Sequence, residues 1–357
     1  MTILKKNRVI LGLSGGVDST TAALLLQKQG LTVIGFYFDV LGNNEAGAKA
    51  AADLAKQLGI DFVSRDVSEV FDKTVIENFC SEYACGRTPN PCVVCNPTVK
   101  FRQLLDVARE KEAYYIATGH YARVVRDEAS GISYIRKGAN EKKDQSYMLY
   151  RLGQDVLSRL ILPLGDFKTK DQTREMARER GLTNADASDS QEICFIDDKS
   201  ESYGDFLTRR RVPAVSGNFV DASGKILGKH QGISNYTIGQ RKGLGIALGK
   251  PAFVTRIDPD TGDVTLGDNA DLFCCEVRSK DNFFAETSGS GLPAAFEENL
   301  AVSAKIRYAA KAAPAVVTKT SDGRLLTTFE EPQRAATPGQ SIVFYDGDRV
   351  IGGGFID

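Results

Sequence analysis

The first two hundred residues alternate short apolar runs with longer segments of helical periodicity. Strand-like runs, rich in β-branched and aromatic residues, cover 9–14, 31–40 and 60–68. Helix-like segments lie at 20–29 and at 46–59, where the closing glycine is a natural helix C-cap. Strand–helix alternation predicts a parallel sheet with helices on both faces. Ligands of such sheets bind beyond the carboxyl ends of the strands.

Two further helices and a strand are predicted before the pattern of the chain changes from helical periodicity to short strands and turns. The helices cover 71–86 and 99–113, and the strand covers 113–125. After the segment 204–211 the helical periodicity fades, and glycines, short alternating strands and turn pairs take over. The pattern therefore predicts an α/β domain followed by two β-rich domains, over 1–205, 206–275 and 276–357.

Length and charge narrow the class of protein. The 357 residues are enough for two or three domains, and no run approaches the ~18 consecutive apolar residues of a membrane span. The basic start and the short apolar stretch after it run straight into a glycine-rich turn without a cleavage site, so they predict a first strand, not a signal peptide. We expect a cytoplasmic protein that does not bind membranes. The net charge is −1, so a nucleic-acid partner would need locally gathered basic residues.

The glycine-rich turn SGGVDS, Ser14–Ser19, lies between the first strand and the first helix. Its glycines allow close approach of the backbone to a ligand, and the amide groups of the helix start favour an anion. Asp18 would repel a phosphate unless Mg²⁺ lies between them, which suggests a metal-bound nucleotide. The plainer alternative is a structural turn. The stretch matches the loop of the PP-loop adenylating enzymes, or N-type ATP pyrophosphatases, and this likeness implies cleavage of ATP between its α and β phosphates.

The cysteines are the second chemical signal. Seven is an odd number for a secreted disulfide framework. In GRTPNPCVVCNPTVKF, which starts at Gly86, a helix is expected to open near Pro97. Cys95 would then lie near a helix N-terminus, where the dipole lowers the pKa of a thiol, and Arg87 and Lys100 would add positive charge.

Cys92 and Cys95 also form a CxxC pair, which is compatible with zinc, a redox pair or part of an iron–sulfur site. A zinc ribbon would need a second CxxC, which the chain lacks. Cys194, in the short apolar run ICFI, is the remaining candidate partner. The other cysteines are expected to be buried or incidental: Cys80, Cys85, Cys274 and Cys275.

The motifs SGGVDS, GRTPNPxxxCNxxxKF, ATGHYAR, KDQSY and ICFI follow one another in this order, and GKHQGISNYTIGQRKGLGIA and PGQSIVFYDGDRVIGGGFI come later. In these motifs nearly the whole chain resembles the tRNA-specific 2-thiouridylase family. The resemblance implies a PP-loop domain followed by two smaller β-rich domains, of which the last is a β-barrel. It also implies ATP with Mg²⁺, and tRNA for Lys, Glu and Gln as substrate, whose wobble uridine (U34) exchanges its 2-oxygen for sulfur. A cysteine desulfurase or a sulfur-relay protein is the expected sulfur donor.

The resemblance also implies roles for single residues. Cys95 would be the nucleophile, and Cys194 would carry the sulfur as a persulfide and then form a disulfide with Cys95. The implied ATP contacts are Gly12, Leu13, Ser14, Gly15, Gly16, Val17, Asp18, Ser19, Phe38 and Gly119. The implied tRNA contacts are Asn90, Pro91, His120, Asp144, Gln145, Ser146, Arg307, Tyr308 and Gln340.

One position departs from the family pattern. Many members have Asp where this chain has Cys92, and that Asp is proposed to act as an acid or base. Cys92 replaces this group or, as the alternative, joins Cys95 and Cys194 as ligands of a [4Fe–4S] cluster. Two rival functions remain. The first is an amide-forming PP-loop ligase, whose activity would not depend on Cys95. The second is an RNA-binding protein without ATP turnover.

Overall fold

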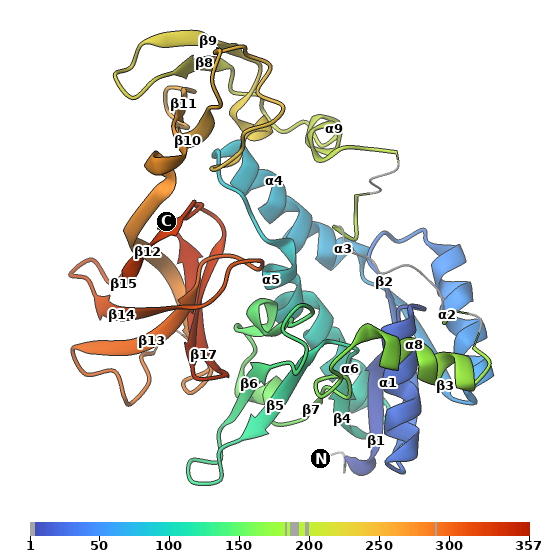
Figure 1. Ribbon diagram of the computed structural model, residues 1–357. Coiled ribbons are helices and arrows are strands. Elements are labelled where there is room, and N and C mark those ends of the chain that lie inside the picture. The colour runs from blue at the N-terminus through green and yellow to red at the C-terminus, as the bar shows by residue number, and fades with distance from the viewer. Residues whose placement is uncertain (1–3, 183, 186–192, 197–199, 290) are drawn as a thin grey trace.

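The computed structural model describes residues 4–182, 184–185, 193–196, 200–289 and 291–357. Its N-terminal part is built on a sheet in the order β3-β2-β1-β4-β7, in which every neighbouring pair is parallel (Figure 1). The predicted parallel sheet is therefore confirmed. Its strands are β1 (Lys5–Gly12), β2 (Thr32–Asp39), β3 (Asp61–Asp66), β4 (Ala113–Ala117) and β7 (Leu160–Ile161).

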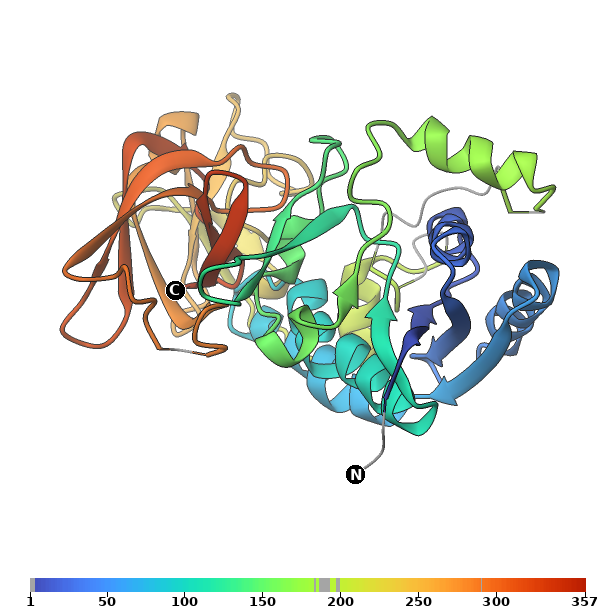
Figure 2. The same cartoon turned by 90° about the horizontal axis from the view of Figure 1, so that it is seen from below.

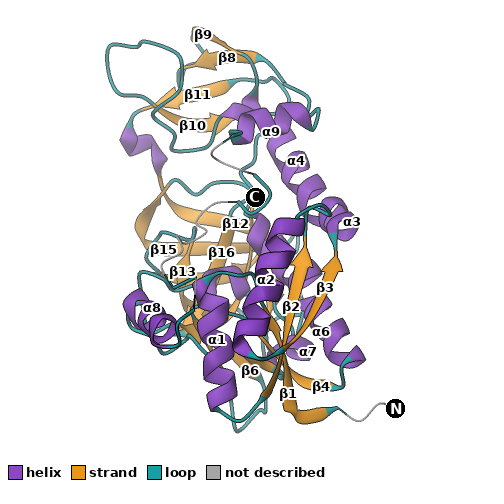
Figure 3. Cartoon of the chain, turned by 90° about the vertical axis from the view of Figure 1, so that its right-hand side faces the viewer, coloured by secondary structure: helices purple, strands orange, loops and turns teal. Residues whose placement is uncertain are grey.

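Helices cover both faces of this sheet, as Figure 3 shows. Alternate side chains of β1 point to opposite faces, so Ile10 joins one apolar cluster and its neighbours Val9 and Leu11 join another. The first cluster is completed by α6, and the second by α1, α2 and α8. Gly59 ends α2 in the left-handed conformation, as its sequence predicts. The helices are α1 (Val17–Lys28), α2 (Glu45–Leu58), α6 (Phe101–Glu110) and α8 (Lys170–Glu179).

Two helical stretches follow β3. The first is predicted correctly, and it consists of α3 (Ser68–Phe71), the π-helical turn η1 (Asp72–Ile76) and α4 (Glu77–Ala84). The second starts earlier than the sequence suggested, at Pro91 and not near Pro97, because the Asn90 side chain accepts a hydrogen bond from the Cys92 amide and caps it. Pro97 lies inside a π-helical turn. This stretch consists of α5 (Pro91–Cys95), η2 (Asn96–Lys100) and α6.

The predicted strand over 113–125 is in fact two strands in two different sheets. β4 stays in the parallel sheet, and the chain then turns at Gly119, where a Cβ atom would lie 3.0 Å from the backbone of Asp18. β5 (Ala122–Arg126) and β6 (Ser133–Lys137) form a hairpin that joins the C-terminal sheet through β17 (Arg349–Ile356). The short elements η3 (Ser146–Leu149) and α7 (Gln154–Leu157) follow before β7.

The central part of the chain is a small sheet in the order β10-β11-β8-β9, preceded by α9 (Tyr203–Arg209). It lies at the top of Figure 1, beside the far end of α4. Its elements are β8 (Gly217–Val220), β9 (Ile226–His230), η4 (Ile233–Asn235), β10 (Phe253–Ile257), β11 (Val264–Gly267) and η5 (Asn269–Leu272).

The C-terminal part is a closed β-barrel, which Figure 2 shows at the side opposite to the parallel sheet. Closure comes from the pairing of β12 with both β15 and β17. The expected domain boundary at 275/276 falls within β12, which pairs with the barrel strand β15 from its first residue, Phe273. The barrel strands are β12 (Phe273–Phe284), β13 (Asn299–Lys305), β14 (Ala313–Lys319), β15 (Leu325–Arg334), β16 (Ser341–Asp346) and β17.

Candidate active site

A pocket of about 290 Å³ opens at the carboxyl ends of β1, β2 and β4. This is the edge at which parallel sheets bind ligands. Among the residues implied as ATP contacts, Gly15, Gly16 and Val17 shape the turn without lining the pocket. The lining residues are Gly12, Leu13, Ser14, Asp18, Ser19, Tyr37, Phe38, Lys100, Thr118, Gly119, His120 and Gln145.

The glycine-rich turn leaves the start of α1 open to a ligand. Gly15 has a φ of +83°, a value that favours glycine. Gly16 is the N-cap, and among the described residues no side chain caps the helix. The Ser19 hydroxyl donates to the Gly16 carbonyl oxygen at 3.0 Å, which holds the turn. The first amide groups of α1 and the positive end of its dipole therefore remain available for an anion.

Asp18 is the one carboxylate among the described residues that line this pocket. Its Oδ1 accepts hydrogen bonds from the Tyr121 hydroxyl at 2.7 Å and from Lys170 Nζ at 2.5 Å. Lys170 was missed by the sequence analysis because it lies 152 residues away. A single carboxylate suits Mg²⁺ that is held mainly by phosphate oxygens. The residues present therefore fit a Mg²⁺–nucleotide, and Asp18 would be the protein ligand of the ion.

Phe38 forms a half-buried wall of the same pocket. Its ring meets that of Phe36 edge to face, with centroids 5.4 Å apart. A Cβ atom at Gly12 would lie 3.6 Å from the Phe38 ring, so the glycine leaves this side of the ring uncovered by a side chain. An aromatic surface beside a phosphate-binding turn is suited to stacking an adenine ring.

His120 lies at the border of the pocket and is held as a neutral imidazole. Its Nδ1 is 2.7 Å from the Thr118 hydroxyl, and its ring stacks on Phe101. Burial, and secondly the charge of Lys100, hold the pKa of His120 well below its usual range. His120 can thus exchange hydrogen bonds with a ligand but does not supply positive charge near neutral pH.

Cys95 lies at the end of α5, inside a continuous helical stretch. The predicted lowering of its pKa by a helix N-terminus is wrong, because the helix starts four residues earlier. Burial raises the pKa of the Cys95 thiol, and the charge of Lys100 lowers it in part. Arg87 does not act on this thiol as expected, since it forms an ion pair with Glu82 at 2.8 Å. Cys92, one turn earlier on α5, has an exposed side chain.

Cys194 lies beside these two cysteines in space. Although solvent reaches part of the residue, the protein atoms packed around it raise the pKa of the Cys194 thiol to about 12. The charges of Cys95 and Cys92 raise this pKa further, and Lys100 opposes them. All seven cysteines are free thiols. Two thiols of α5 and a third about a hundred residues later in sequence are therefore near one another, and Lys100, whose charge acts on the pKa of Cys95 and Cys194, also lines the nucleotide pocket.

The three thiols do not form a ready-made metal site. Within the described ranges, no three His, Cys, Asp or Glu side chains are arranged to hold a metal ion. The other four cysteines lie apart from this group. Cys80 is half-buried near Arg210, Cys85 is exposed after α4, and Cys274 and Cys275 lie on β12.

The residues implied as tRNA contacts differ in their exposure. Tyr308 is 37% exposed. Burial is the main cause that raises the pKa of its hydroxyl, and the charges of Asp144 and then Cys92 add to it, so Tyr308 lies near the cysteine site. Gln145 lines the pocket and accepts a hydrogen bond from the Tyr121 amide. Asp144 and Ser146 are buried and bonded to each other, so their side chains support the pocket wall and do not face solvent.

The remaining implied tRNA contacts already have partners within the chain. Arg307 donates to the Arg334 carbonyl oxygen, and Gln340 donates to the carbonyl oxygens of Thr88 and Pro89. Asn90 caps α5, and Pro91 is the first residue of that helix.

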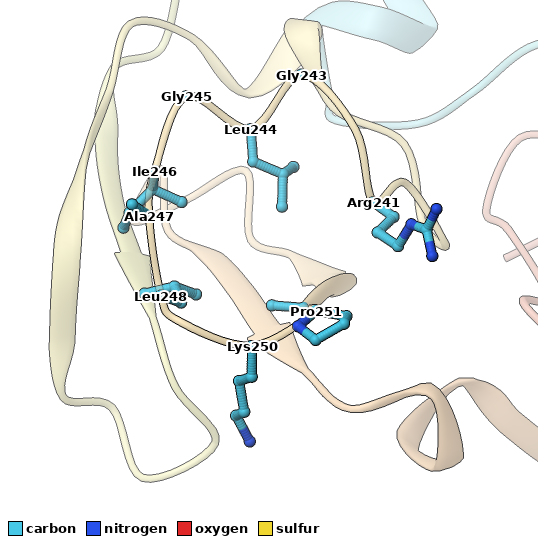
Figure 4. A pocket seen from close by; sticks show the side chains of 10 residues that line it. Arg241, Gly243, Leu244, Gly245, Ile246, Ala247, Leu248, Lys250 and Pro251 are labelled. Atoms are coloured by element: carbon cyan, nitrogen blue, oxygen red, sulfur yellow. The ribbon is translucent and has the colours of Figure 1, made fainter.

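A second, separate pocket lies in the central part of the chain. Figure 4 shows the loop that forms it, with Leu244 pointing inward and Arg241 and Lys250 at its ends. Gly243 and Gly245 both have positive φ values, so the glycines serve the curvature of this loop. None of these residues lines the nucleotide pocket.

Comparisons with known proteins agree with this architecture. Three family models match the chain in succession: the tRNA methyl transferase HUP domain over 7–198, the tRNA methyl transferase PRC-barrel domain over 204–268 and the aminomethyltransferase beta-barrel domain over 280–356. None of the helices formed by the described residues combines the length and apolar character needed to cross a membrane.

Several relatives of similar length are tRNA-specific 2-thiouridylases by name. The chain is 43% identical over 367 residues to the tRNA-specific 2-thiouridylase MnmA of Acetivibrio thermocellus, covering 99% of this chain and 100% of that one. It is 46% identical over 363 residues to the protein of the same name from Clostridium acetobutylicum, with 98% and 99% covered. The match with the Carboxydothermus hydrogenoformans protein is 44% and covers 100% and 99%. The chain therefore belongs to the tRNA-specific 2-thiouridylase MnmA family.

Proposed function

We propose that this enzyme replaces the 2-oxygen of the wobble uridine (U34) in tRNA for Lys, Glu and Gln with sulfur, using ATP and a cysteine persulfide. Family membership supports tRNA thiolation by a PP-loop enzyme. The observation that carries the finer proposal is the position of Lys100. It lines the nucleotide pocket and acts on the pKa of both Cys95 and Cys194. Activation by ATP and delivery of sulfur would thus meet at one place.

The first step activates the base. The C2 carbonyl oxygen of uridine is a poor leaving group and must first be activated. It therefore attacks the α-phosphorus of ATP, and pyrophosphate leaves. The amide groups at the start of α1 would hold the phosphates, and Phe38 would stack on the adenine. Mg²⁺ bound with Asp18 would neutralise phosphate charge. The pyrimidine is then an adenylate whose C2 accepts a nucleophile.

The second step delivers sulfur through the two cysteines. The terminal sulfur of a persulfide on Cys194 attacks C2, and AMP leaves. Cys95 then attacks the Cys194 sulfur, so the S–S bond to the added sulfur breaks and its electron pair forms the thiocarbonyl of 2-thiouridine. A Cys95–Cys194 disulfide remains, and a thiol reductant must reduce it before the next turnover.

The test follows both half-reactions with wild-type enzyme, tRNA, ATP, Mg²⁺ and a cysteine desulfurase with cysteine as sulfur source. We expect AMP and 2-thiouridine at U34 in equal amounts. Cys194→Ser should lose thiolation by at least about 100-fold but still release pyrophosphate and leave adenylated tRNA, since it removes only the sulfur carrier. Cys95→Ser should trap tRNA covalently on Cys194. Cys275→Ser, at an exposed cysteine on β12, is the matched control and should retain activity.

Other outcomes would point to the alternatives. Iron and labile sulfide in anaerobically purified protein, lost together with activity in Cys92→Ala, would assign a [4Fe–4S] route and overturn the persulfide on Cys194. Full ATP turnover in Cys95→Ser on a non-tRNA acceptor would indicate a PP-loop ligase. Binding of tRNA without AMP formation by the wild type would indicate an RNA-binding protein.

A further inference from the structure

Cys194 lines a further cavity of about 710 Å³, called here the Cys194 cavity. Its described lining residues and those of the nucleotide pocket have no member in common. The walls come from the loop after β2, from α3 and η1, from the segment 194–196 and from α9 with its flanks. The lining residues are Val40, Leu41, Asn43, Ser68, Glu69, Asp72, Ile76, Cys194, Phe195, Ile196, Glu201, Phe206, Arg209 and Arg210.

The Cys194 cavity and the nucleotide pocket lie on one apolar cluster. Phe195, which lines the cavity, belongs to this cluster, and Phe38, which lines the nucleotide pocket, packs against it. Cys95 also packs against the cluster, and its charge acts on the pKa of Cys194. The two openings are therefore close together but lined by different residues. This arrangement lets Cys194 receive sulfur from one opening and deliver it at the other.

Leu41 gives the cavity an exposed apolar side chain. It is 46% exposed, although leucine is usually buried. Its loop has a defined conformation, because the Asp39 carboxylate accepts hydrogen bonds from the amides of Leu41, Gly42 and Asn44, each at 3.0 Å. Val40 continues the apolar surface into the cavity. An apolar side chain held in place beside a reactive thiol suits the centre of a protein–protein contact.

The charged groups of the cavity argue for a protein and against nucleic acid as its occupant. Arg210 forms an ion pair with Asp72, and Arg209 donates to Glu201 at 2.7 Å. With Glu69, the described lining residues carry three carboxylates and only two guanidinium groups, both of them paired. Such a surface does not attract the phosphate backbone of tRNA, which is bound by groups of basic side chains.

We propose that the Cys194 cavity is the port through which the sulfur-donor protein loads Cys194: a segment of that protein with a cysteine persulfide enters the cavity and packs an apolar side chain on Leu41. This inference rests on the proposed function, since it takes Cys194 as the sulfur carrier. The Cys194 sulfur attacks the outer sulfur of the donor persulfide, and the S–S bond of the donor breaks. The inner sulfur leaves as a thiol with the proton that Cys194 gives up. Cys194 then holds the persulfide, and no oxidant or reductant is consumed.

The test is Leu41→Glu, which places a charge where the donor protein would make its apolar contact. Wild type and variant are mixed with a cysteine desulfurase and cysteine, without ATP or tRNA, and the persulfide on Cys194 is measured by alkylation and peptide mass spectrometry. We expect the initial rate of loading to fall about 10-fold or more. Loading by sodium tetrasulfide, a small inorganic donor that needs no docking, should stay within about twofold of the wild type. Val316→Glu, at an exposed apolar residue of β14, is the matched control and should load normally from both donors.

A second measurement does not depend on the sulfur transfer itself. The photo-crosslinker benzoylphenylalanine in place of Leu41 should crosslink to the desulfurase on irradiation, and in place of Val316 it should not. Equal loading of Leu41→Glu and wild type by the desulfurase, or a raised Kd for tRNA in Leu41→Glu with normal loading, would overturn the inference. If neither donor leaves a persulfide on Cys194 of the wild type, the proposed function fails, while the crosslinks still decide where the donor protein binds.

Discussion

At the scale of single residues, the chemistry of the site depends on burial more than on sequence neighbours. Cys95 follows Pro91 and Cys92 in a motif that suggested an activated thiolate, yet burial raises its pKa. The same holds for Cys194. Both thiols are thus protonated near neutral pH in the free enzyme.

The raised pKa of Cys194 predicts how its reactivity depends on pH. Because the thiolate is the reactive form, its alkylation by iodoacetamide should be slow near neutral pH and should still increase above about pH 10, where an ordinary thiol has levelled off. Quantitative mass spectrometry of the Cys194 peptide across a pH series measures this, with N-acetylcysteine as reference. A plateau at or below about pH 10, like that of an ordinary thiol, would contradict the assignment of a raised pKa.

At the scale of elements, two helix starts meet at the nucleotide pocket. Asp18 lies in the first turn of α1, and Lys170 is the first residue of α8. A lysine at a helix N-terminus is unfavourable because the helix dipole is positive there, and the ion pair with Asp18 offsets this. The Lys170 side chain is only 12% exposed, so the pair is partly desolvated. The two helices are thereby linked through the charge that faces the ligand.

This pairing predicts a specific effect of Lys170→Met on ATP binding. Without the lysine, the Asp18 carboxylate loses a donor that orients it toward the Mg²⁺–nucleotide, so we expect the Kd for Mg²⁺–ATP to rise about 10-fold. Isothermal titration calorimetry with Mg²⁺–ATP measures this. Lys168→Met, an exposed lysine two residues earlier, is the matched control and should leave the affinity unchanged. Equal affinities for the two variants would show that Lys170 serves helix packing alone.

At the scale of the whole molecule, the barrel and the α/β part share one core. Val343, Tyr345 and Val350 of the barrel belong to the same apolar cluster as Tyr134 of β6 and Ile10 of β1. The hairpin β5–β6 extends the barrel sheet, and the Lys137 amide donates to the Asp348 carbonyl oxygen. The domain boundaries predicted from the sequence pattern, at 205/206 and 275/276, therefore separate elements that pack against one another in the folded protein.

A shortened chain ending at Asp268 tests this integration. We expect the amides of β5 and β6 to exchange hydrogen much faster than in the full chain, because they lose their neighbouring strand and the apolar side chains of the barrel. Hydrogen exchange with mass spectrometry reports on 122–137 directly, and β1 is the internal reference. If β5 and β6 remained as protected as in the full chain, the α/β part would be an independent folding unit.

The sequence by itself determined the elements that depend on local patterns. Apolar periodicity indicated the parallel sheet and its helices, Gly59 marked the end of α2, and the turn from Ser14 to Ser19 indicated the phosphate site. The predictions of the sheet, its helices and the helix end succeed because the interactions that decide them join residues within a few positions of one another, and the phosphate site stays a prediction. The motif order also carried the family resemblance, since motifs are local strings.

Only the tertiary structure decided which distant groups meet. Lys170 reaches Asp18 across 152 positions, and Gln340 reaches Thr88 across 252. The raised pKa of Cys194 depends on atoms packed around it from other elements. No local pattern encodes such contacts, because burial and through-space charge depend on how whole elements pack.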